Sequence, residues 1–398
     1  MPVADLAREH GTPLYVYSGA SMRDAYTSLD AALAGYPHTI HFAFKANSTR
    51  GVIALLRGLG AHADANSGGE IEAALRAGFE PPQIVFTGVG KTRDELDRAV
   101  ALGVKAINIE SRGEADRIAA LACARGVTAR VALRVNPDID PNTHAHISTG
   151  LRVNKFGVPL EFAAGLLRDL ARKPGLEPVG VHVHLGSQIL DVEPLGRAAR
   201  VLADLTREVR DAGVVLSHID MGGGLGIAYD GLTKADPVAY AAAVLPPIRE
   251  TGVHLIVEPG RYLVGAAGIL VGRVADTKSF EGSPRFIILD TGMTELIRPM
   301  LYEAVHRIVA VAPREGEAVE TEIVGPLCET SDTMGHARMI GPAEVDDLFA
   351  VLDAGAYGFV MASNYNRRRF PAEVLVDDGQ ARLIRRRQSF DELFATEI

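Results

Sequence analysis

The sequence predicts an α/β protein: a (β/α)8 barrel of the TIM type, followed by an antiparallel β domain. Over the first two thirds of the chain, short apolar segments alternate with Ala-, Leu- and Arg-rich stretches whose apolar residues recur at helical spacing. After about Arg261 this alternation stops, and strand-like segments separated by turn residues take its place. The expected domains are a barrel over residues 20–262 and a β domain formed by residues 1–19 together with 263–398.

Eight apolar segments in the first part of the chain are expected to be the barrel strands. Helical patterns such as Gly69–Ala77 and Gly113–Arg125 lie between them, and strands joined by helical crossovers form a parallel sheet. Eight strands favour a closed barrel; the alternative is a doubly wound open sheet. No Gly-x-Gly-x-x-Gly motif opens a first βα unit, which weakens the dinucleotide-binding form of that alternative. The eight segments are His41–Phe44, His62–Ala65, Ile84–Thr87, Ala106–Ile109, Arg130–Val135, Val179–Leu185, His218–Met221 and His254–Val257.

Seven strand-like segments in the last third predict the β domain. Turn residues such as Asp377-Asp378-Gly379 separate them, which is typical of antiparallel strands. Thr12–Tyr17 precedes the barrel, is also strand-like, and is expected to pair into the same domain. The seven segments are Phe286–Leu289, Ile308–Val311, Glu322–Val324, Leu348–Leu352, Phe359–Met361, Ala372–Val376 and Ala381–Ile384.

Composition and charge exclude several classes of function. The 398 residues are 47% hydrophobic and 23% charged, as in an ordinary globular protein. A net charge of −9 argues against a nucleic-acid partner, and the short run Arg385–Arg387 is interpreted as a solvated strand end. Without an apolar stretch of about 18 residues or a secretory signal, we expect no membrane partner and a cytoplasmic location. Cys123 and Cys328 have no metal-ligand spacing around them, so no disulfide framework and no metal site are expected.

Polar residues stand at the carboxyl ends of the predicted barrel strands, where barrel enzymes build their sites. Lys45 ends the first strand, and an ammonium there is costly unless it is paired, neutralised or used covalently. The other lysines lie in segments that are interpreted as loops or helix surfaces. Taken alone, Lys45 fits either Schiff-base chemistry or a buried salt bridge.

Two further strand ends carry groups that suit a phosphate and a ring nitrogen. Gly222-Gly223-Gly224 follows a strand, and consecutive glycines let backbone N–H groups converge on an anion; a tight turn is the alternative. Glu258 and Arg261 close the last strand, where an isolated ion pair is the alternative. Together with a lysine for an aldehyde, these groups are what pyridoxal 5′-phosphate requires. A carboxylate beside the pyridine nitrogen keeps it protonated, so the ring stabilises the carbanion left when carbon dioxide departs.

Four motifs in order carry a family resemblance: His41-Phe-Ala-Phe-Lys45-Ala-Asn47, His182-Val-His184-Leu-Gly-Ser187-Gln188, Gly222–Gly226 and Glu258-Pro-Gly-Arg261. Through them the chain resembles the pyridoxal-phosphate-dependent decarboxylases of the alanine racemase-like fold, from Thr12 to about Asp391. Further motifs resemble those of members acting on meso-2,6-diaminoheptanedioate. They are Ile147–Gly150 before Lys155–Gly157, Gly292-Met293 before Arg298-Pro299 and Leu301-Tyr302, Gly325–Glu329, and Ala362–Asn366.

The resemblance implies a role for each matching residue. Lys45 and Cys328 would be catalytic, the first carrying the cofactor as a Schiff base and the second returning a proton. Lys155–Gly157 would belong to a loop that covers the site, and Cys328 and Glu329 would reach the active site of the partner subunit in a homodimer. The implied cofactor-binding residues are Lys45, His184, Ser187, Gly223, Gly224, Glu258, Gly260, Arg261 and Tyr357. The implied substrate-binding residues are Arg261, Arg298, Tyr302, Glu329 and Tyr357.

The implied reaction is decarboxylation of meso-2,6-diaminoheptanedioate at its D-centre to L-lysine and carbon dioxide, the last step of lysine biosynthesis. Arg298 would bind the distal carboxylate through two parallel hydrogen bonds, and Glu329 would pair with the distal amine.

Three rival functions would use the same barrel. A decarboxylase of another basic amino acid, such as ornithine or arginine, would leave Arg298 without a carboxylate to bind. A racemase is disfavoured because a carboxylate at Glu258 protonates the ring and so favours decarboxylation over controlled reprotonation. A non-catalytic regulator that binds the cofactor would show cofactor absorbance without turnover.

Three residues near these motifs are interpreted as structural. His182 is expected on the opposite face of its strand from His184, Cys123 inside a helix and buried, and Asp332 in a turn or polar network. The run Arg367–Arg369 is richer in arginine than the family pattern, and no function is assigned to it.

Overall fold

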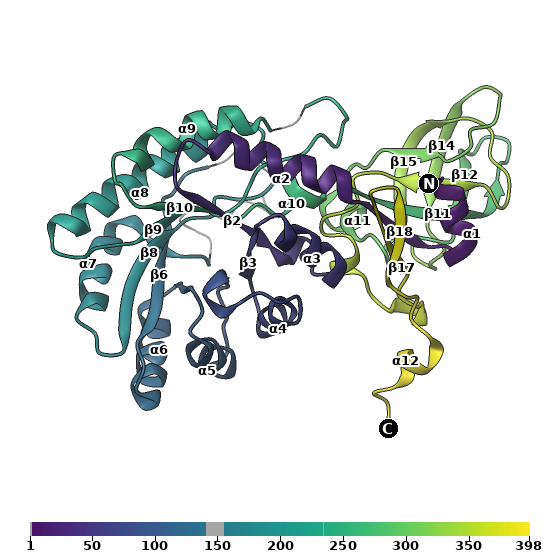
Figure 1. Ribbon diagram of the computed structural model, residues 1–398. Helices are drawn as coiled ribbons and strands as arrows, with labels where there is room; N and C mark the ends of the chain where they lie inside the picture. The colour runs from purple at the N-terminus through teal and green to yellow at the C-terminus, as the bar shows by residue number, and fades with distance from the viewer. Residues whose placement is uncertain (1, 141–154, 234) are drawn as a thin grey trace. The chain divides into compact units, whose positions relative to one another are not determined.

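The computed structural model of the chain describes residues 2–140, 155–233 and 235–398. The motif Ile147–Gly150 lies outside the described residues. The chain divides into two compact units, each built on its own sheet (Figure 1). The barrel unit is Asp24–Ile227 with Lys234–Tyr262, and the sheet unit is Met1–Arg23, Ala228–Thr233 and Leu263–Ile398.

The barrel unit contains the eight predicted parallel strands, and they close into a ring. Each strand pairs in parallel with the next in the order β5-β4-β3-β2-β10-β9-β8-β6, and β6 pairs back with β5. The closed barrel is therefore confirmed and the open sheet is excluded. The strands are β2 (His38–Ala43), β3 (His62–Ala65), β4 (Ile84–Phe86), β5 (Ala106–Ile109), β6 (Ala129–Asn136), β8 (Leu176–His182), β9 (His218–Asp220) and β10 (His254–Val257); β7 (Val158–Pro159) adds a short pair with β6.

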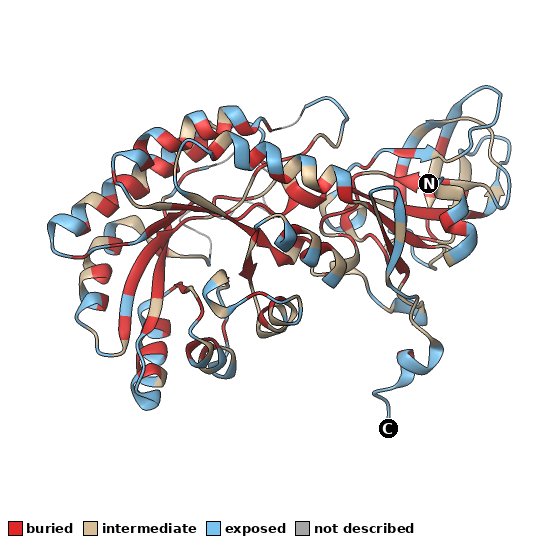
Figure 2. Ribbon diagram, viewed as in Figure 1, coloured by how far each residue is buried: buried red, intermediate tan, exposed pale blue. Residues whose placement is uncertain are grey.

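Helices follow the strands and begin and end where the sequence supplies caps. Ser67 and Ser111 accept hydrogen bonds from the backbone of the first turns of α4 and α6, and Gly103 and Gly126 end α5 and α6 in the left-handed conformation. The strands are buried and the outward faces of the helices are exposed (Figure 2). The helices are α2 (Gly19–Leu33), α3 (Arg50–Gly58), α4 (Gly68–Arg76), α5 (Arg93–Leu102), α6 (Arg112–Arg125), α7 (Leu160–Ala171), α8 (Glu193–Asp211) and α9 (Pro237–Arg249).

Cys123 of α6 is exposed, so the prediction that it is buried is wrong. The buried stripe of this helix is formed by side chains such as Ala115, Ile118 and Ala122. Cys123 lies at the edge of that stripe, because each helical residue is rotated about 100° from its neighbour.

The sheet unit is built on a nine-stranded sheet that includes the first strand of the chain. β1 pairs antiparallel with β11 and parallel with β17. β12 and β14 are also parallel, so the expected antiparallel sheet is mixed. Parallel neighbours need long connections, and a sequence of turns and short strands does not reveal them. The strands are β1 (Leu14–Ser18), β11 (Gly268–Lys278), β12 (Arg285–Leu289), β13 (Ile308–Ala310), β14 (Val319–Val324), β15 (Thr333–Ile340), β16 (Leu348–Val351), β17 (Ala372–Asp377) and β18 (Gln380–Arg385).

Three elements of the sheet unit differ from the prediction. Phe359–Met361 forms a 3-10 helix instead of a strand, and β11 and β15 were not predicted. β11 contains Gly268 and Gly272, which interrupt its apolar pattern. A Cβ at Gly268 would overlap the backbone of Gly355, so this position requires glycine for close backbone approach.

Arginine side chains of the sheet unit pack against the C-terminal helix of the chain. Arg367 and Arg369 lie over the rings of Phe394 and Phe390, which belong to α12 (Phe390–Phe394), at 4.9 and 4.5 Å. Arg385 pairs with the buried carboxylate of Glu373. Arg385 ends β18, and Arg385 and Arg386 are exposed, so the run is a solvated strand end as predicted. It also makes intramolecular contacts, from Arg386 to Glu392 and from Arg387 to the Pro13 carbonyl.

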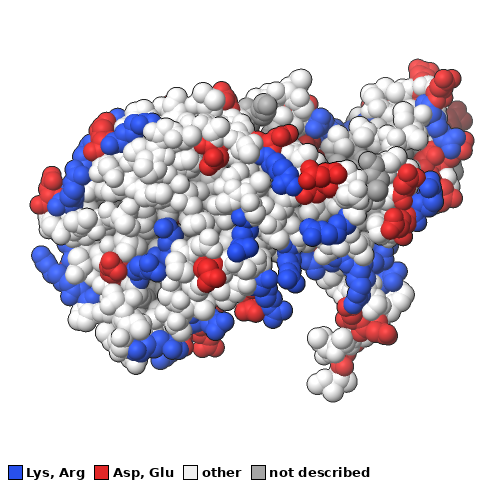
Figure 3. Space-filling model, in the orientation of Figure 1, with Lys and Arg blue, Asp and Glu red and all other residues white. Residues whose placement is uncertain are grey.

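Charged side chains of both signs are interspersed on the face of the molecule shown in Figure 3. Among the described residues, no helix has both the length and the apolar character needed to cross a membrane.

Candidate active site

Lys45 lies at the mouth of the barrel among acidic side chains. It is half-buried in the 3-10 helix Phe44–Ala46, directly after β2. Burial and the nearby Glu258 raise the pKa of Asp64 to about 8, and the Lys45 ammonium opposes this rise. The ammonium also helps to lower the pKa of Glu258. The lysine is thus held by electrostatic attraction at the end of its strand.

A buried triad of His182, Asp220 and Glu258 lies inside the barrel. A ring nitrogen of His182 and one carboxylate oxygen from each of the two acids all lie within 4.8 Å of one another. His182 Nε2 is 3.2 Å from Glu258 Oε2. Burial opposes ionisation of Glu258, but His182 holds the pKa of this carboxyl below its usual range. Burial, with Glu258 beside it, raises the pKa of Asp220 well above its usual range. Within this acidic pair, Glu258 therefore favours the ionised form and Asp220 the neutral form.

The expectation that His182 lies on the opposite face of its strand from His184 is wrong, because residues two apart along a strand point to the same face. His182 is fully buried and contacts Glu258, and its interpretation as a structural residue stays a prediction. Asp220 and Gly222 are related in the same way at the end of β9, and the Gly222 N–H donates to Asp220 Oδ1 at 2.9 Å. This period-two pattern is the sequence signal that could have identified both members of the triad.

The glycine run after β9 packs against His184 and Glu258 at distances that only glycine permits. Gly222 and Gly224 have φ of 63° and 129°, and a Cβ at Gly223 would overlap the Glu258 carbonyl oxygen. The Gly223 N–H donates to His184 Nδ1 at 3.2 Å, and burial lowers the pKa of His184 well below its usual range. The His184 ring is therefore neutral, with its proton on Nε2.

Ser187 and Arg261 provide hydrogen-bond donors beside the glycine run. The buried guanidinium of Arg261 donates to Ser187 Oγ through Nε at 3.2 Å and through Nη2 at 2.9 Å. A hydroxyl that accepts from arginine can still donate its own proton to an anion. At Gly260, an added Cβ would lie 2.9 Å from Ala46 Cβ, so glycine lets this strand end approach the segment that carries Lys45.

Arg298 and Tyr302 lie on one short helix of the sheet unit, α11 (Arg298–Tyr302). Arg298 is 6% exposed, and its Nη1 donates to His306 Nε2 at 2.7 Å. Its guanidinium lies 4.7 Å from the centre of the Tyr229 ring. His306 and Tyr229 are two contacts of a predicted site residue that the sequence did not reveal, because neither belongs to a recognised motif.

Cys328 and Glu329 lie in an exposed turn of the sheet unit, beside the motif Ala362–Asn366. The Tyr365 hydroxyl donates to Glu329 Oε1, and Asn366 Nδ2 donates to Cys328 Sγ at 3.6 Å. Asp332, 2% exposed, accepts from the N–H groups of Met293 and Leu327, which confirms it as a network residue. Tyr357 is half-buried and has a left-handed backbone with φ of 55°.

Each unit thus carries its own group of predicted site residues. The barrel unit brings together Lys45, His184, Ser187, Gly223, Gly224, Glu258, Gly260 and Arg261. The sheet unit carries Arg298, Tyr302, Cys328, Glu329 and Tyr357. Lys155–Gly157 adjoins the barrel: the Gly157 N–H donates to Glu110 Oε2 at 2.6 Å, and Arg134 lies 4.6 Å from the centre of the Phe156 ring.

Lys91 is buried, which contradicts its interpretation as a solvated lysine. Its Nζ donates to Gly88 O at 2.6 Å, to Asn108 O at 2.7 Å and to Glu114 Oε1 at 2.9 Å. The Lys91 and Glu114 side chains are 1% and 3% exposed. An ammonium has three protons, and all three of these are donated, so Lys91 is committed to structure.

Replacing Lys91 with alanine is expected to lower the free energy of unfolding by about 3–5 kcal/mol, because it leaves the buried Glu114 carboxylate without its cation. Lys173→Ala is the matched control, since Lys173 pairs with Asp116 at 2.7 Å on the surface and should contribute less than about 1 kcal/mol. Urea unfolding of both variants measures the difference. Equal destabilisation by the two substitutions would show that the Lys91 pair is not a stabilising contact.

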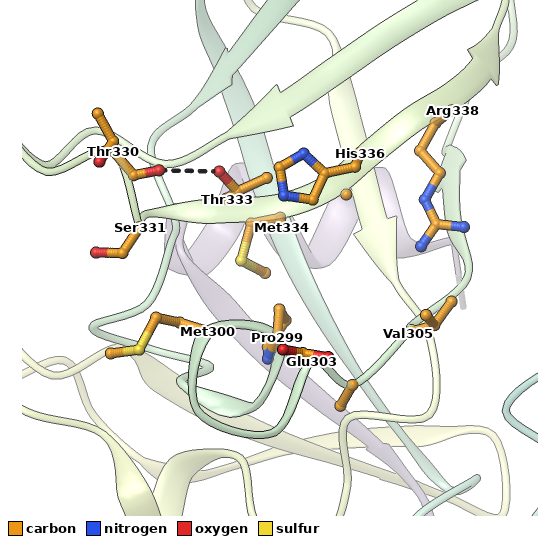
Figure 4. A pocket seen from close by; sticks show the side chains of 12 residues that line it. Pro299, Met300, Glu303, Val305, Thr330, Ser331, Thr333, Met334, His336 and Arg338 are labelled. Carbon is orange, nitrogen blue, oxygen red and sulfur yellow. Dashed lines mark hydrogen bonds between the residues drawn. The ribbon is translucent and has the colours of Figure 1, made fainter.

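A pocket of about 550 Å³ lies in the sheet unit between the α11 segment and β15 (Figure 4). Met300 and Glu303 line one side, and Met334 and His336 line the other. The Thr333 hydroxyl donates to the Thr330 carbonyl at its edge, at 3.3 Å. Neither Arg298 nor Tyr302 lines this pocket, but its lining residue Ser331 donates to Oε2 of Glu329 at 3.1 Å.

The barrel mouth fits pyridoxal 5′-phosphate. The Gly222 and Gly223 N–H groups are donated to Asp220 and His184, so Ser187 is the side-chain donor that could hold a phosphate beside the glycine run. The neutral His184 ring could stack on an aromatic cofactor. The ionised Glu258 carboxylate could keep a ring nitrogen protonated, and Lys45 offers the amine for an aldehyde. Fold and site together define an enzyme that uses this cofactor.

Comparison with known proteins agrees with this class. The family described as "Pyridoxal-dependent decarboxylase, pyridoxal binding domain" matches residues 20–265. The chain is 44% identical to the diaminopimelate decarboxylase of Vibrio cholerae, over 100% of this chain and 95% of that one. It is 46% identical to the diaminopimelate decarboxylase of Pseudomonas fluorescens, over 98% of this chain and 94% of that one. The crystal structure of diaminopimelate decarboxylase from Helicobacter pylori complexed with L-lysine has a TM-score of 0.96 and 37% identity, and covers 99% of this chain and 98% of that one.

The chain therefore belongs to the pyridoxal-dependent decarboxylases, among the diaminopimelate decarboxylases of that family. It is a carboxy-lyase that depends on pyridoxal 5′-phosphate, and the predicted cofactor, barrel and family are confirmed.

Proposed function

We propose that the chain decarboxylates meso-2,6-diaminoheptanedioate at its D-centre and releases L-lysine and carbon dioxide, as the last step of lysine biosynthesis. The observation that carries this choice of substrate is Arg298, a buried guanidinium held by His306 and Tyr229. A guanidinium matches the distal carboxylate of this substrate, which ornithine and arginine lack. Two diaminopimelate decarboxylases that are 44% and 46% identical over nearly the whole chain support the choice.

The proposed division of work follows from the charge of each group. When bound, pyridoxal 5′-phosphate supplies an electron-accepting ring that stabilises negative charge at the substrate carbon losing carbon dioxide. Lys45 would hold the cofactor covalently. Glu258 would maintain the proton on the ring nitrogen, because its own carboxylate is ionised beside His182. Asp220 is buried, and burial raises its pKa well above the usual range, so it would support Glu258 as a neutral neighbour.

The remaining site residues would bind the phosphate and the substrate. His184, Ser187, Gly223, Gly224 and Gly260 are proposed as cofactor-binding, and Arg298, Tyr302 and Glu329 as substrate-binding. Arg261 and Tyr357 are proposed to reach both. Carbon dioxide leaves the D-centre and a proton replaces it on the same carbon, so a donor is needed there. The Cys328 thiol is the proposed donor, contributed with Glu329 by the partner subunit of a homodimer located in the cytoplasm.

The test is an assay of purified protein with cofactor and meso-2,6-diaminoheptanedioate, in which lysine and carbon dioxide are measured. Ornithine, arginine and D-lysine are assayed beside it under the same conditions. Efficient release of carbon dioxide from ornithine or arginine, with none from the diacid, would favour a decarboxylase of another basic amino acid. Cofactor absorbance with no turnover of any compound would favour the non-catalytic regulator.

Cys328→Ala is expected to slow protonation roughly 10²–10⁴-fold, the usual contribution of a positioned acid. Carbon dioxide release should be impaired less than lysine formation, because only the second step lacks its donor. Misplaced protonation should also inactivate the enzyme during turnover, with cofactor recovered in its amine form. Carbon dioxide, lysine and released cofactor are measured in the same reaction. Equal loss of both products without the amine form would assign proton return to another group.

Mixing Cys328→Ala with Lys45→Ala tests whether the site is shared between subunits. Random exchange makes about half of the dimers mixed, and each mixed dimer would contain one intact site, so about a quarter of wild-type activity should return. A double variant, Lys45→Ala/Cys328→Ala, mixed with Lys45→Ala is the control and should recover none. No recovery in dimers verified as mixed would contradict the shared site.

A further inference from the structure

The surroundings of Arg298 contain a hydrogen-bond chain that fixes the protonation of one histidine. His306 is fully buried, with Nε2 2.7 Å from Arg298 Nη1 and Nδ1 2.8 Å from the Leu352 carbonyl oxygen. A guanidinium can only donate, so Nε2 must accept. A carbonyl oxygen can only accept, so Nδ1 must carry the proton. The ring is therefore neutral, in a single tautomer.

The same chain fixes the orientation of the guanidinium. One N–H of Arg298 points at His306, and the Tyr229 ring lies 4.7 Å from the guanidinium carbon. The Tyr229 and His306 rings meet edge to face, with centres 5.2 Å apart. A hydrogen bond at one edge and a ring beside the guanidinium restrict both its position and its plane. A bidentate contact with a carboxylate needs such restriction, because two parallel hydrogen bonds form only in one plane.

We propose that His306 is a positioning residue that orients Arg298 toward the distal carboxylate of the substrate, with Tyr229 supporting the same orientation. The inference rests on the proposed function, in which Arg298 binds that carboxylate. His306 contacts no reacting atom in this role. It acts by keeping a neutral acceptor opposite Arg298, which neither lowers the charge of the guanidinium nor competes with an anion for it.

Two amide variants separate the two hydrogen bonds of the imidazole. Glutamine places its amide near the position of Nε2 and can accept from Arg298. Asparagine places its amide near the position of Nδ1 and can donate only to the Leu352 carbonyl. His306→Asn should therefore disturb Arg298 while keeping the backbone contact, and His306→Gln should do the reverse.

The measurement is equilibrium binding to the holoenzyme, followed by the absorbance of the cofactor. The ligands are L-lysine, which keeps the distal carboxylate, and cadaverine, which is the same diamine without it. His306→Asn should weaken L-lysine binding roughly 10- to 100-fold, the usual effect of losing a hydrogen bond to a charged group, and change cadaverine binding less than about 3-fold. His306→Gln should bind both ligands within about 3-fold of wild type.

If His306→Gln instead binds both ligands more weakly than His306→Asn does, the histidine only anchors the backbone at Leu352. That result would overturn the proposal. Unchanged L-lysine binding in both variants would overturn it as well. Arg298→Ala is measured in parallel. If Arg298→Ala selectively loses affinity for L-lysine and His306→Asn does not, only the inference about His306 fails. If Arg298→Ala loses both ligands equally, the proposed carboxylate contact fails, and the role of His306 fails with it.

Discussion

Replacing Lys45 with alanine is expected to reduce decarboxylation roughly a thousandfold or more, because the group that holds the cofactor covalently is lost. The expectation rests on the position of Lys45 at a barrel strand end, where its ammonium acts on the carboxyl groups of Asp64 and Glu258. Lys91, the buried lysine of the same unit, donates all three of its protons to structural acceptors. Of these two lysines, Lys45 is therefore the one suited to bind an aldehyde.

The covalent link can be checked independently of turnover. Borohydride reduction of the native holoenzyme should fix cofactor to the peptide that contains Lys45, and the absorbance band above about 400 nm should be present in native protein and lost in Lys45→Ala. Lys173→Ala, which removes a partly exposed surface lysine, should keep both the band and the activity. Cofactor fixed to a different lysine, or a band that persists in Lys45→Ala, would show that another amine holds the cofactor.

The barrel could be predicted because its strands are buried on both faces. Such strands are short and mostly apolar, and β5 and β10 have the predicted bounds. β3 has them too, although two of its four residues, His62 and Asp64, are polar. The sheet unit was harder to predict because its strands are less uniform. β11 is interrupted by glycines that its neighbours require for close approach, and β15 has only two buried residues, Met334 and Gly335.

The site could be predicted only where a residue stands at a strand end or in a recognised motif. Lys45, Gly223 and Glu258 met both conditions. Asp220 ends β9, and its period-two relation to Gly222 is a local signal that could have identified it. His306 met neither condition, because its importance comes from partners elsewhere in the chain, the Leu352 carbonyl and Arg298. Contacts of the kind that His306 makes are created by the fold, and no local sequence pattern predicts them.

Charge state completes the description of the barrel mouth. Asp64, Asp220 and Glu258 are all buried there, and ionisation of all three in a low-dielectric interior would be costly. Burial raises the pKa of Asp64 to about 8 and that of Asp220 well above its usual range, whereas His182 helps to hold the pKa of Glu258 below its usual range. Glu258 is thus the acid of the three that most favours the charged form, which a protonated ring nitrogen requires.

Arg298 is expected to determine the choice of substrate. Its guanidinium is buried, and a carboxylate bound there would make two charge-assisted hydrogen bonds in a site with little water. Removing one partner of such a contact costs roughly 2–5 kcal/mol, which corresponds to about 30- to several thousandfold in kcat/KM. Arg298→Ala should therefore lose this much with meso-2,6-diaminoheptanedioate while the cofactor absorbance stays normal.

Arg298→Lys should lose nearly as much, because an ammonium keeps the charge but cannot form two parallel hydrogen bonds or use His306 and Tyr229 in the same geometry. D-Lysine, which lacks the distal carboxylate, should be a poor substrate of the wild-type enzyme and should be little affected by either change. The measurement is kcat/KM for both compounds in three enzymes: wild type, Arg298→Ala and Arg298→Lys. A selective loss with the diacid would assign the arginine to the carboxylate, whereas an equal loss with both compounds would assign it to the fold or the cofactor.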